Sequence, residues 1–196
     1  MQSLFSHYRT GKENDMEQTI KRINRELKCQ GAIVDFYADT MQLPDGKTAV
    51  WDYIEHRKGA AAALAVLPDG KLLMVKQYRN ALERYTLEIP AGARDSREEP
   101  FEVCAARELE EETGYRCGSL EHLISIKTTV AFCNEGIEVF VARDLVPTRQ
   151  HLDPDEYVEL TAHSLEELCQ WIYEGKIQDS KTVAAIMAYK NKYINK

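Results

Sequence analysis

The sequence predicts an α+β fold, or a mixed-sheet α/β sandwich, on three observations. Several stretches rich in β-branched and aromatic residues are separated by Pro-Asp-Gly turns, which is typical of strands. Other stretches place apolar residues at helical spacing behind capping residues, which indicates helices. Because these strands and helices do not alternate regularly, a doubly wound fold is not expected.

The first expected element is a short amphipathic helix over residues 14–27. Apolar residues from Met16 to Leu27 recur at helical spacing behind a cap at Asn14 or Asp15. The apolar stripe of this N-terminal helix must pack on the body of the protein or on a second subunit.

Two hairpins are expected next. Residues 31–56 hold two strand-like stretches around one Pro-Asp-Gly turn, and residues 60–79 repeat the arrangement. In the second pair both strands are almost continuously apolar at their centres, which is typical of strands buried on both faces. A short strand that ends at Pro90 should follow.

A helix is predicted from about Pro100 to Thr113, stopped by Gly114 in the C-cap position. Strands are then expected over residues 120–130, 136–145 and 156–164. Two helices close the chain. The first begins with a capping box formed by Ser164 and Glu167, and the second with a cap at Asp179 or Ser180.

The length of 196 residues suits one domain with a small appendage. We divide the chain into an N-terminal helix and hairpin segment, 1–56, and a larger domain, 57–196. The net charge of −7 means that the surface as a whole repels nucleic acid. A substrate that contains phosphate would therefore need a local positive charge, such as a bound cation, to offset the negative charge of the protein.

The five cysteines are scattered, with no C-x-x-C pair, and are expected to be free or buried thiols in a reducing compartment. The N-terminus lacks an apolar signal region, and no stretch approaches 18 apolar residues. We therefore expect a soluble cytoplasmic protein that binds no membrane.

The acidic stretch RELEEETGY, Arg107 to Tyr115, is the main functional signal. On a helical wheel three of its glutamates fall inside or beside the apolar arc of the helix, whereas Glu110 falls away from it. The three are Glu108, Glu111 and Glu112. A run of charge is often only a solvated face, but inward carboxylates repel one another and favour a divalent cation such as Mg²⁺ or Mn²⁺. Arg107 is either a brace to a carboxylate such as Glu99 or a plain surface arginine.

Residues Gly92 to Tyr115 resemble the Nudix box, G-x5-E-x7-R-E-U-x-E-E-x-G-U, where U is apolar. The second half matches completely, whereas six residues instead of five separate Gly92 from Glu99. Stretches before and after the box are similar to the ADP-ribose pyrophosphatase branch of that family, and the resemblance runs from about Gly31 to Met187. It implies an α/β/α sandwich, the Nudix fold.

The resemblance also implies roles for individual residues. Metal ligands would be Glu108, Glu111, Glu112 and the backbone carbonyl of Ala91. Glu156 would be the catalytic base, with Glu111 as the other catalytic candidate. The alternative for Glu156 is an exposed loop carboxylate without a catalytic role. Substrate contacts would come from Trp51, Arg57, Arg79, Phe132 and Glu135. Structural positions of the box would be Gly92, Glu99, Arg107 and Gly114. The alternative for Trp51 is a tryptophan in the core of a sheet, and the alternative for the two arginines is a position on the surface without a role in binding.

The function implied by the resemblance is metal-dependent hydrolysis of a nucleoside diphosphate sugar. ADP-ribose, cleaved to AMP and ribose 5-phosphate, is the first choice. GDP-mannose or another nucleoside diphosphate sugar is the nearest alternative, and a domain that binds a nucleotide without cleaving it is a third. The family resemblance further implies a homodimer formed with the help of the N-terminal segment. Within the substrate loop the residues Val130 and Ala131 replace the Pro and Gly of many members.

Overall fold

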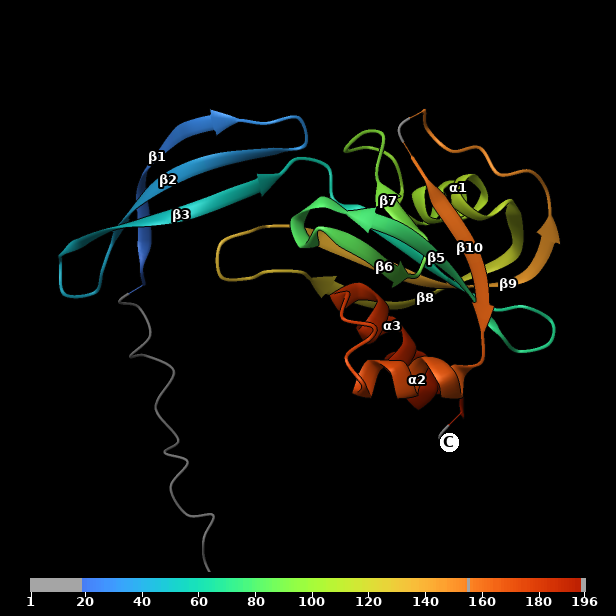
Figure 1. The fold of residues 1–196 in the computed structure, drawn as a ribbon. Coiled ribbons are helices and arrows are strands. Elements are labelled where there is room, and N and C mark those ends of the chain that lie inside the picture. Colours follow the sequence, from blue (N-terminus) through green and yellow to red (C-terminus); the bar gives the residue numbers. More distant parts are fainter. Residues whose placement is uncertain (1–18, 155, 195–196) are drawn as a thin grey trace, which may run out of the picture. The chain divides into compact units, whose positions relative to one another are not determined.

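The computed structural model describes residues 19–154 and 156–194. The chain divides into two compact units, Met1–Glu55 and His56–Lys196. The described part of the first unit is a three-stranded sheet in the order β1-β2-β3 (Figure 1). Its strands are β1 (Lys21–Gln30), β2 (Val34–Gln42) and β3 (Thr48–His56). The hairpin predicted for residues 31–56 is thus confirmed.

The N-terminal helix predicted for residues 14–27 is wrong over residues 21–27, which belong to strand β1; residues 14–18 lie outside the described residues. Strand β1 pairs antiparallel with β2, and irregularities after Arg22 and Leu27 break the two-residue alternation of its side chains. Of the apolar residues that suggested a helix, Ile23 and Leu27 lie in β1, and their spacing of four residues suits one face of a strand as well. Arg25 secures the pairing through two hydrogen bonds of 2.6 Å to Asp39 of β2. Cross-strand partners therefore override the local pattern.

The described part of the second unit contains two sheets and three α-helices (Figure 1). One sheet has the order β10-β5-β6 and the other the order β7-β4-β9-β8, in which β4 and β9 are parallel. The strands are β4 (Ala60–Ala65), β5 (Leu72–Arg79), β6 (Arg84–Glu88), β7 (Ala91–Ala93), β8 (Tyr115–Lys127), β9 (Gly136–Pro147) and β10 (Val158–His163). The helices are α1 (Phe101–Thr113), α2 (Leu165–Tyr173) and α3 (Ser180–Tyr189), with a 3₁₀ turn at Asn80–Leu82 and a π-helical turn at Lys190–Ile194.

Strand β4 forms the centre of the core, and its side chains alternate between two layers. Ala60, Ala62 and Leu64 belong to a cluster that includes buried residues of α2 and α3. Ala61, Ala63 and Ala65 face the opposite layer, where they pack with buried residues of α1. Since strand side chains alternate with a period of two, one strand can contact helices on both faces. This arrangement confirms the predicted α+β sandwich.

The second predicted hairpin is wrong as a pair of strands. β4 and β5 are joined by the expected Pro-Asp-Gly turn, but they share only the bridge between Val66 and Leu72 and then enter different sheets. β4 pairs instead with β7 and β9, and β5 with β6 and β10. Strands that are apolar on both faces gain more burial between layers than in an isolated two-stranded ribbon.

The helix termini follow the sequence. Gly114 ends α1 in the left-handed conformation, at φ 70°. Ser164 and Glu167 form the predicted capping box of α2, and the Asp179 side chain caps α3 by accepting the Thr182 N–H. Each cap satisfies backbone groups that a helix end leaves without partners.

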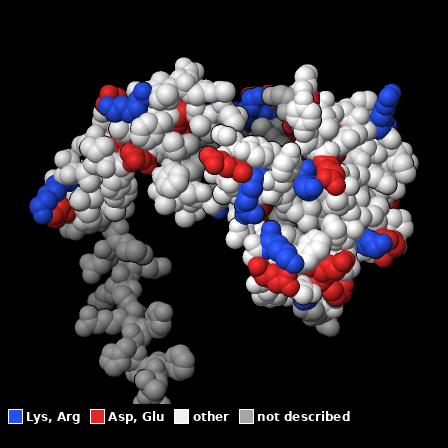
Figure 2. All heavy atoms as spheres, in the orientation of Figure 1, with Lys and Arg blue, Asp and Glu red and all other residues white. Residues whose placement is uncertain are grey.

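All five cysteines are free thiols. On the face shown in Figure 2, lysine and arginine side chains of the second unit are interspersed with aspartate and glutamate instead of forming a broad basic patch. Within residues 19–154 and 156–194, no helix combines the length and the apolar character that a membrane span requires.

Candidate active site

Helix α1 presents Glu108 directly to the backbone of Gly92. A Cβ atom at position 92 would lie 2.1 Å from Glu108 Cδ and 2.2 Å from each carboxylate oxygen. No side chain fits there while Glu108 keeps this position, so Gly92 permits the close approach of the carboxylate. The start of the predicted motif and its acidic helix are therefore in direct contact.

Glu112 lies one helical turn further on and is buried, at 3% exposure. Its Oε2 accepts a hydrogen bond of 3.0 Å from the backbone N–H of Ala91. This bond connects the C-terminal part of α1 to the first residue of β7. The carboxylate thus lies beside the segment whose carbonyl the family resemblance names as a metal ligand.

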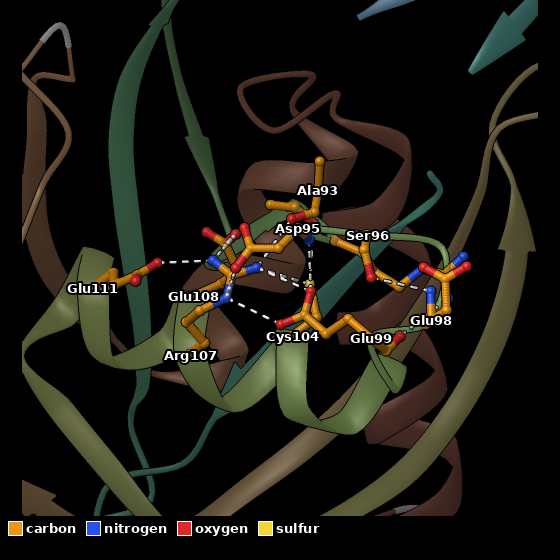
Figure 3. A network of polar contacts seen from close by, with 11 residues as sticks. Ala93, Asp95, Ser96, Glu98, Glu99, Cys104, Arg107, Glu108 and Glu111 are labelled. Carbon is orange, nitrogen blue, oxygen red and sulfur yellow. Dashed lines mark hydrogen bonds and ion pairs between the residues drawn. The ribbon is translucent and has the colours of Figure 1, made fainter. Parts of the chain in front are cut away.

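Arg107 organises the partly buried polar contacts between α1 and residues 93–99 (Figure 3). Its Nε donates to Glu99 at 3.1 Å, and its Nη2 donates to the carbonyl of Ala93 at 3.1 Å. Its Nη1 donates to Glu108 at 2.7 Å and to Glu111 at 2.9 Å. The brace to Glu99 is present, so Arg107 is not a plain surface arginine.

A loop after β9 closes over the C-terminal end of α1. The N–H of Thr148 donates to the carbonyl of Gly114 at 2.6 Å, and the N–H of His151 donates to that of Glu111 at 2.9 Å. The Gln150 side chain donates to the carbonyl of Glu112 at 2.6 Å. The loop therefore satisfies carbonyls that the helix end leaves open. A Cβ at Gly114 would lie 2.9 Å from the Gln150 nitrogen, so this glycine also makes room for the loop.

This anchored loop carries Glu156 to a polar cavity of about 290 Å³. Helix α1 contributes Arg107, Glu108 and Glu111 to the cavity wall, and residues 91–95 form a second side. The loop contributes His151, Asp153 and Glu156, and Lys58 completes the lining. The structure thus brings together residues that are 65 positions apart in the sequence, from Ala91 to Glu156.

Burial raises the pKa of Glu112 to about 8, against the hydrogen bond from Ala91, and the charges of Glu108 and Glu156 raise it further. Burial likewise raises the pKa of Glu108 to about 7, although the Arg107 guanidinium opposes the shift. Burial thus disfavours the ionised form of both carboxylates, and for Glu108 the Arg107 guanidinium offsets only part of this effect. A proton or a cation would relieve the repulsion.

The donor atoms in and beside this cavity fit a hard divalent cation. Carboxylate oxygens of Glu108, Glu111 and Glu112 are the ligand type that Mg²⁺ and Mn²⁺ prefer. Across the described residues, no three His, Cys, Asp or Glu side chains already converge on one ion position. Arg107 holds Glu108 and Glu111 in this arrangement, so a cation would compete with its hydrogen bonds.

Other candidate residues lie outside the cavity lining. Arg79, at the end of β5, donates from Nε and Nη2 to Glu88 at 2.8 and 2.6 Å. Phe132 is exposed in the loop before β9, and Glu135 accepts a hydrogen bond of 2.7 Å from Thr128 there. The carbonyl of Arg57 accepts a hydrogen bond from Arg97, and Trp51 is an exposed residue of β3 in the first unit. The alternative of a tryptophan buried in a sheet core is therefore wrong.

The exposures of the glutamates differ from the sequence expectation in two details. The side chain of Glu111 is 39% exposed, whereas that of Glu110, expected as solvated surface, is 23% exposed and pairs with Arg116 at 2.8 Å. Glu111 lies at the edge of the inward arc, and a partner from the next strand covers Glu110.

No role was expected from the sequence for the buried Glu88 or for several residues of the cavity wall, which are Lys58, Ala93, Arg94, Asp95, His151 and Asp153. Lys58 belongs to no motif or periodic pattern. The other cavity residues lie in the Nudix-box stretch or in the loop that carries Glu156, so their place in the sequence was a usable signal. Glu88 had a usable signal, because a lone carboxylate in the apolar run TLEIP is expected to be buried with a partner.

This chain resembles a known protein family and several known proteins over most of its length. The NUDIX domain family model matches residues 56–186. The chain is 42% identical over 168 residues to the methanol dehydrogenase activator of Bacillus methanolicus, covering 85% of this chain and 90% of that protein. It is 40% identical over 168 residues, with the same coverage, to the ADP-ribose pyrophosphatase of Bacillus subtilis (strain 168).

A solved structure, described as the crystal structure of an ADP compounds hydrolase, superposes with a TM-score of 0.80 at 19% identity. It covers 89% of this chain and 94% of that chain, and it supports the fold. The chain belongs to the Nudix family.

Proposed function

We propose that this protein hydrolyses the diphosphate bond of ADP-ribose to AMP and ribose 5-phosphate, with Mg²⁺ or Mn²⁺ as cofactor. The observation that carries the proposal is the placement of Glu108, Glu111 and Glu156 on one polar cavity, with Glu112 buried beside it. Relatives named ADP-ribose pyrophosphatase, at 40% and 30% identity, support the choice of substrate.

When bound, the cation would offset the charge of the diphosphate and make a water molecule more acidic. The protein's own groups position the reaction. Arg107 fixes the directions of Glu108 and Glu111, and Ala91 would add its carbonyl to the ligands. Glu156 would accept the proton of the attacking water, so that one new P–O bond forms while the bridging P–O bond breaks. Glu111 remains the second candidate for that base.

Cationic side chains outside the cavity would bind the substrate's anionic groups. We assign this role to Arg79 and Arg57, with Phe132 and Glu135 from the loop before β9 at the sugar end. Trp51 would stack on the adenine, since its side chain is exposed and aromatic faces bind nucleobases well. Arg79 is held by Glu88, and this hydrogen bonding keeps its guanidinium in one orientation.

The first unit supports a homodimer. Between residues 19 and 55 the buried residues are Asp35 and Asp39, whereas Ile23, Leu27 and Val50 are exposed. A three-stranded sheet with apolar side chains facing water needs further packing for stability. We propose that a second copy of the chain covers this sheet. Free thiols favour a cytoplasmic setting, and the net charge of −7 argues against nucleic acid as a partner.

A panel of substrates with Mg²⁺ tests the proposal. Brisk turnover of ADP-ribose, with weaker turnover of GDP-mannose and other nucleoside diphosphate sugars, is the expected result. No turnover of ADP-ribose beside rapid cleavage of GDP-mannose would contradict it. Binding of ADP-ribose without cleavage would identify the protein as a nucleotide-binding domain instead.

A further inference from the structure

Glu88 is a buried carboxylate with four hydrogen-bond donors. It ends β6 and is only 1% exposed. Arg79 donates to both of its oxygens, at 2.8 and 2.6 Å, and Thr86 donates to Oε1 at 2.6 Å. The Lys181 ammonium group is the fourth donor, and it contacts Oε2. Since an ionised carboxylate has about four acceptor sites, Glu88 is fully satisfied.

The two cations around Glu88 differ in their access to solvent. Lys181, in the first turn of α3, is 6% exposed and is therefore committed to the interior. The side chain of Arg79 is 41% exposed. One buried cation is sufficient to balance the charge of Glu88. Asp179 accepts a hydrogen bond of 3.0 Å from Lys181, but it also receives the Thr182 N–H at the helix N-terminus, which itself favours a negative charge. Because Lys181 balances Glu88, the positive charge of Arg79 remains available for a bound anion.

The same cluster is connected to the acidic helix through the backbone. The N–H of Ile89 donates to the hydroxyl of the buried Thr182 at 3.0 Å, and two residues later the N–H of Ala91 donates to Glu112. Residues 88–91 are thus fastened to α3 at one end and to α1 at the other. Arg79 is held at the start of this segment by Glu88, and Glu112 is bonded to its end. Arg79 is therefore joined to the acidic helix through residues 88–91.

We propose that Glu88 and Lys181 are positioning residues for Arg79. Glu88 fixes the plane of the guanidinium group, and Lys181 balances Glu88, so that Arg79 keeps a usable positive charge for the anionic diphosphate of the substrate. The inference rests on the proposed hydrolysis of ADP-ribose. It assigns an indirect role in substrate binding to two buried residues, Glu88 and Lys181.

The substitution Lys181→Met tests the inference, because it leaves Arg79 as the sole counter-charge of Glu88. The KM for ADP-ribose should rise by about 10-fold or more, the effect expected when a charged hydrogen-bond donor is lost to another partner. The kcat should change little, since Lys181 contacts no reacting atom. Lys192→Met is the matched control: it removes an exposed lysine that pairs with Glu121, and it should leave KM unchanged.

The double variant Glu88→Gln with Lys181→Met distinguishes positioning from packing. A neutral glutamine needs no counter-charge, and its amide oxygen can still accept a hydrogen bond from Arg79. Arg79 therefore keeps its orientation while its charge is no longer neutralised, and KM should return toward the wild-type value. Circular dichroism melting of each variant checks the fold. If Lys181→Met does not fold, KM is compared instead between the double variant and Arg79→Gln. We then expect a high KM for Arg79→Gln and a KM near the wild-type value for the double variant.

Three results would overturn the inference. The first is a wild-type KM for Lys181→Met, and the second is a KM for the double variant as high as that of Lys181→Met or higher. In the fallback comparison, an equally high KM for the double variant and Arg79→Gln has the same meaning. A wild-type protein that neither binds nor cleaves ADP-ribose would overturn the proposed function itself, which is a separate outcome visible before any variant is made.

Discussion

The carboxylate of Glu112 accepts a 3.0 Å hydrogen bond from the backbone N–H of Ala91, and it does so in a position that is 97% shielded from solvent by the rest of the chain. A single neutral donor is a weak partner for a buried anion. Burial consequently raises the pKa of Glu112 to about 8. The fold therefore tolerates a carboxylate that destabilises it, which is typical of functional sites.

The first prediction concerns stability and its dependence on pH. A carboxyl group with a raised pKa binds a proton more tightly when folded than when unfolded, so metal-free stability falls as pH rises from about 4.5 toward about 8. Glu112→Gln removes this loss. In EDTA at a pH above 8, urea unfolding should show a gain of about 1–3 kcal/mol for the variant, and at pH 5 almost none.

Glu110→Gln is the matched control for this experiment. It lies in the same helix but pairs with Arg116, so it should not stabilise the protein at high pH. Equal or lower stability of Glu112→Gln above pH 8 would show that Glu112 is adequately compensated in the folded protein.

The second prediction concerns Gly92. A methyl group there would lie 2.1 Å from the Glu108 carboxyl carbon, so Gly92→Ala must displace Glu108 or the strand. Turnover should fall by about 10-fold or more, because displacements near 1 Å at a site have effects of this size. Gly70→Ala is the control: it meets no atom within 4 Å, and its φ of +84° should cost about 1 kcal/mol of stability with turnover intact. Full activity of Gly92→Ala would argue against a role for Glu108 in its present position.

The third prediction concerns the loop that carries Glu156. Gln150→Ala removes the 2.6 Å hydrogen bond to the Glu112 carbonyl and loosens the loop from α1. We expect kcat to fall by about 10-fold, because Glu156 is no longer held toward the cavity. Steady-state kinetics beside Arg149→Ala, an exposed neighbour, measures the effect. A similar kcat for both variants would mean that the remaining backbone bonds hold the loop.

The fourth prediction concerns acid stability. Burial alone would raise the pKa of Glu88, but the hydrogen bonds from Arg79 and the charge of Lys181 outweigh it and lower the pKa to about 2. Glu88 thus stabilises the protein above its ordinary pKa, and this contribution is lost as pH falls from about 4.5 to about 2. Between pH 5 and pH 2 the wild type should lose about 3 kcal/mol more than Glu88→Gln. If the free energies of unfolding of the wild type and Glu88→Gln fall in parallel between pH 5 and pH 2, this prediction is wrong.

The sequence predicted best what depends on local periodicity. The 3.6-residue repeat of α1 placed Glu108 and Glu112 beside the apolar residues Cys104 and Leu109, and the structure buries Glu112, Cys104 and Leu109. Gly114 and the caps of α2 and α3 were also evident, because caps have short sequence signatures.

Features set by distant partners could not be read in this way. The sequence of β1 has apolar residues at helical spacing, but the segment forms a strand because it pairs with β2, where Asp39 is the partner of Arg25. The separation of β4 and β5 into two sheets depends on β9 and β10, which are formed more than 60 residues later. The approach of Glu156 to Glu108 depends on the loop anchored to α1, and no local pattern encodes that contact.

Phosphorus NMR of ADP-ribose mixed with the protein and Mg²⁺ tests the role of the acidic helix most directly. For the wild type, the diphosphate signals should give way to equal amounts of AMP and ribose 5-phosphate. For Glu112→Gln, the same conversion should be slower by about 100-fold or more, with the fold intact by circular dichroism. Conversion by Glu112→Gln at the wild-type rate, or unchanged diphosphate signals with the wild type, would contradict hydrolysis at this helix.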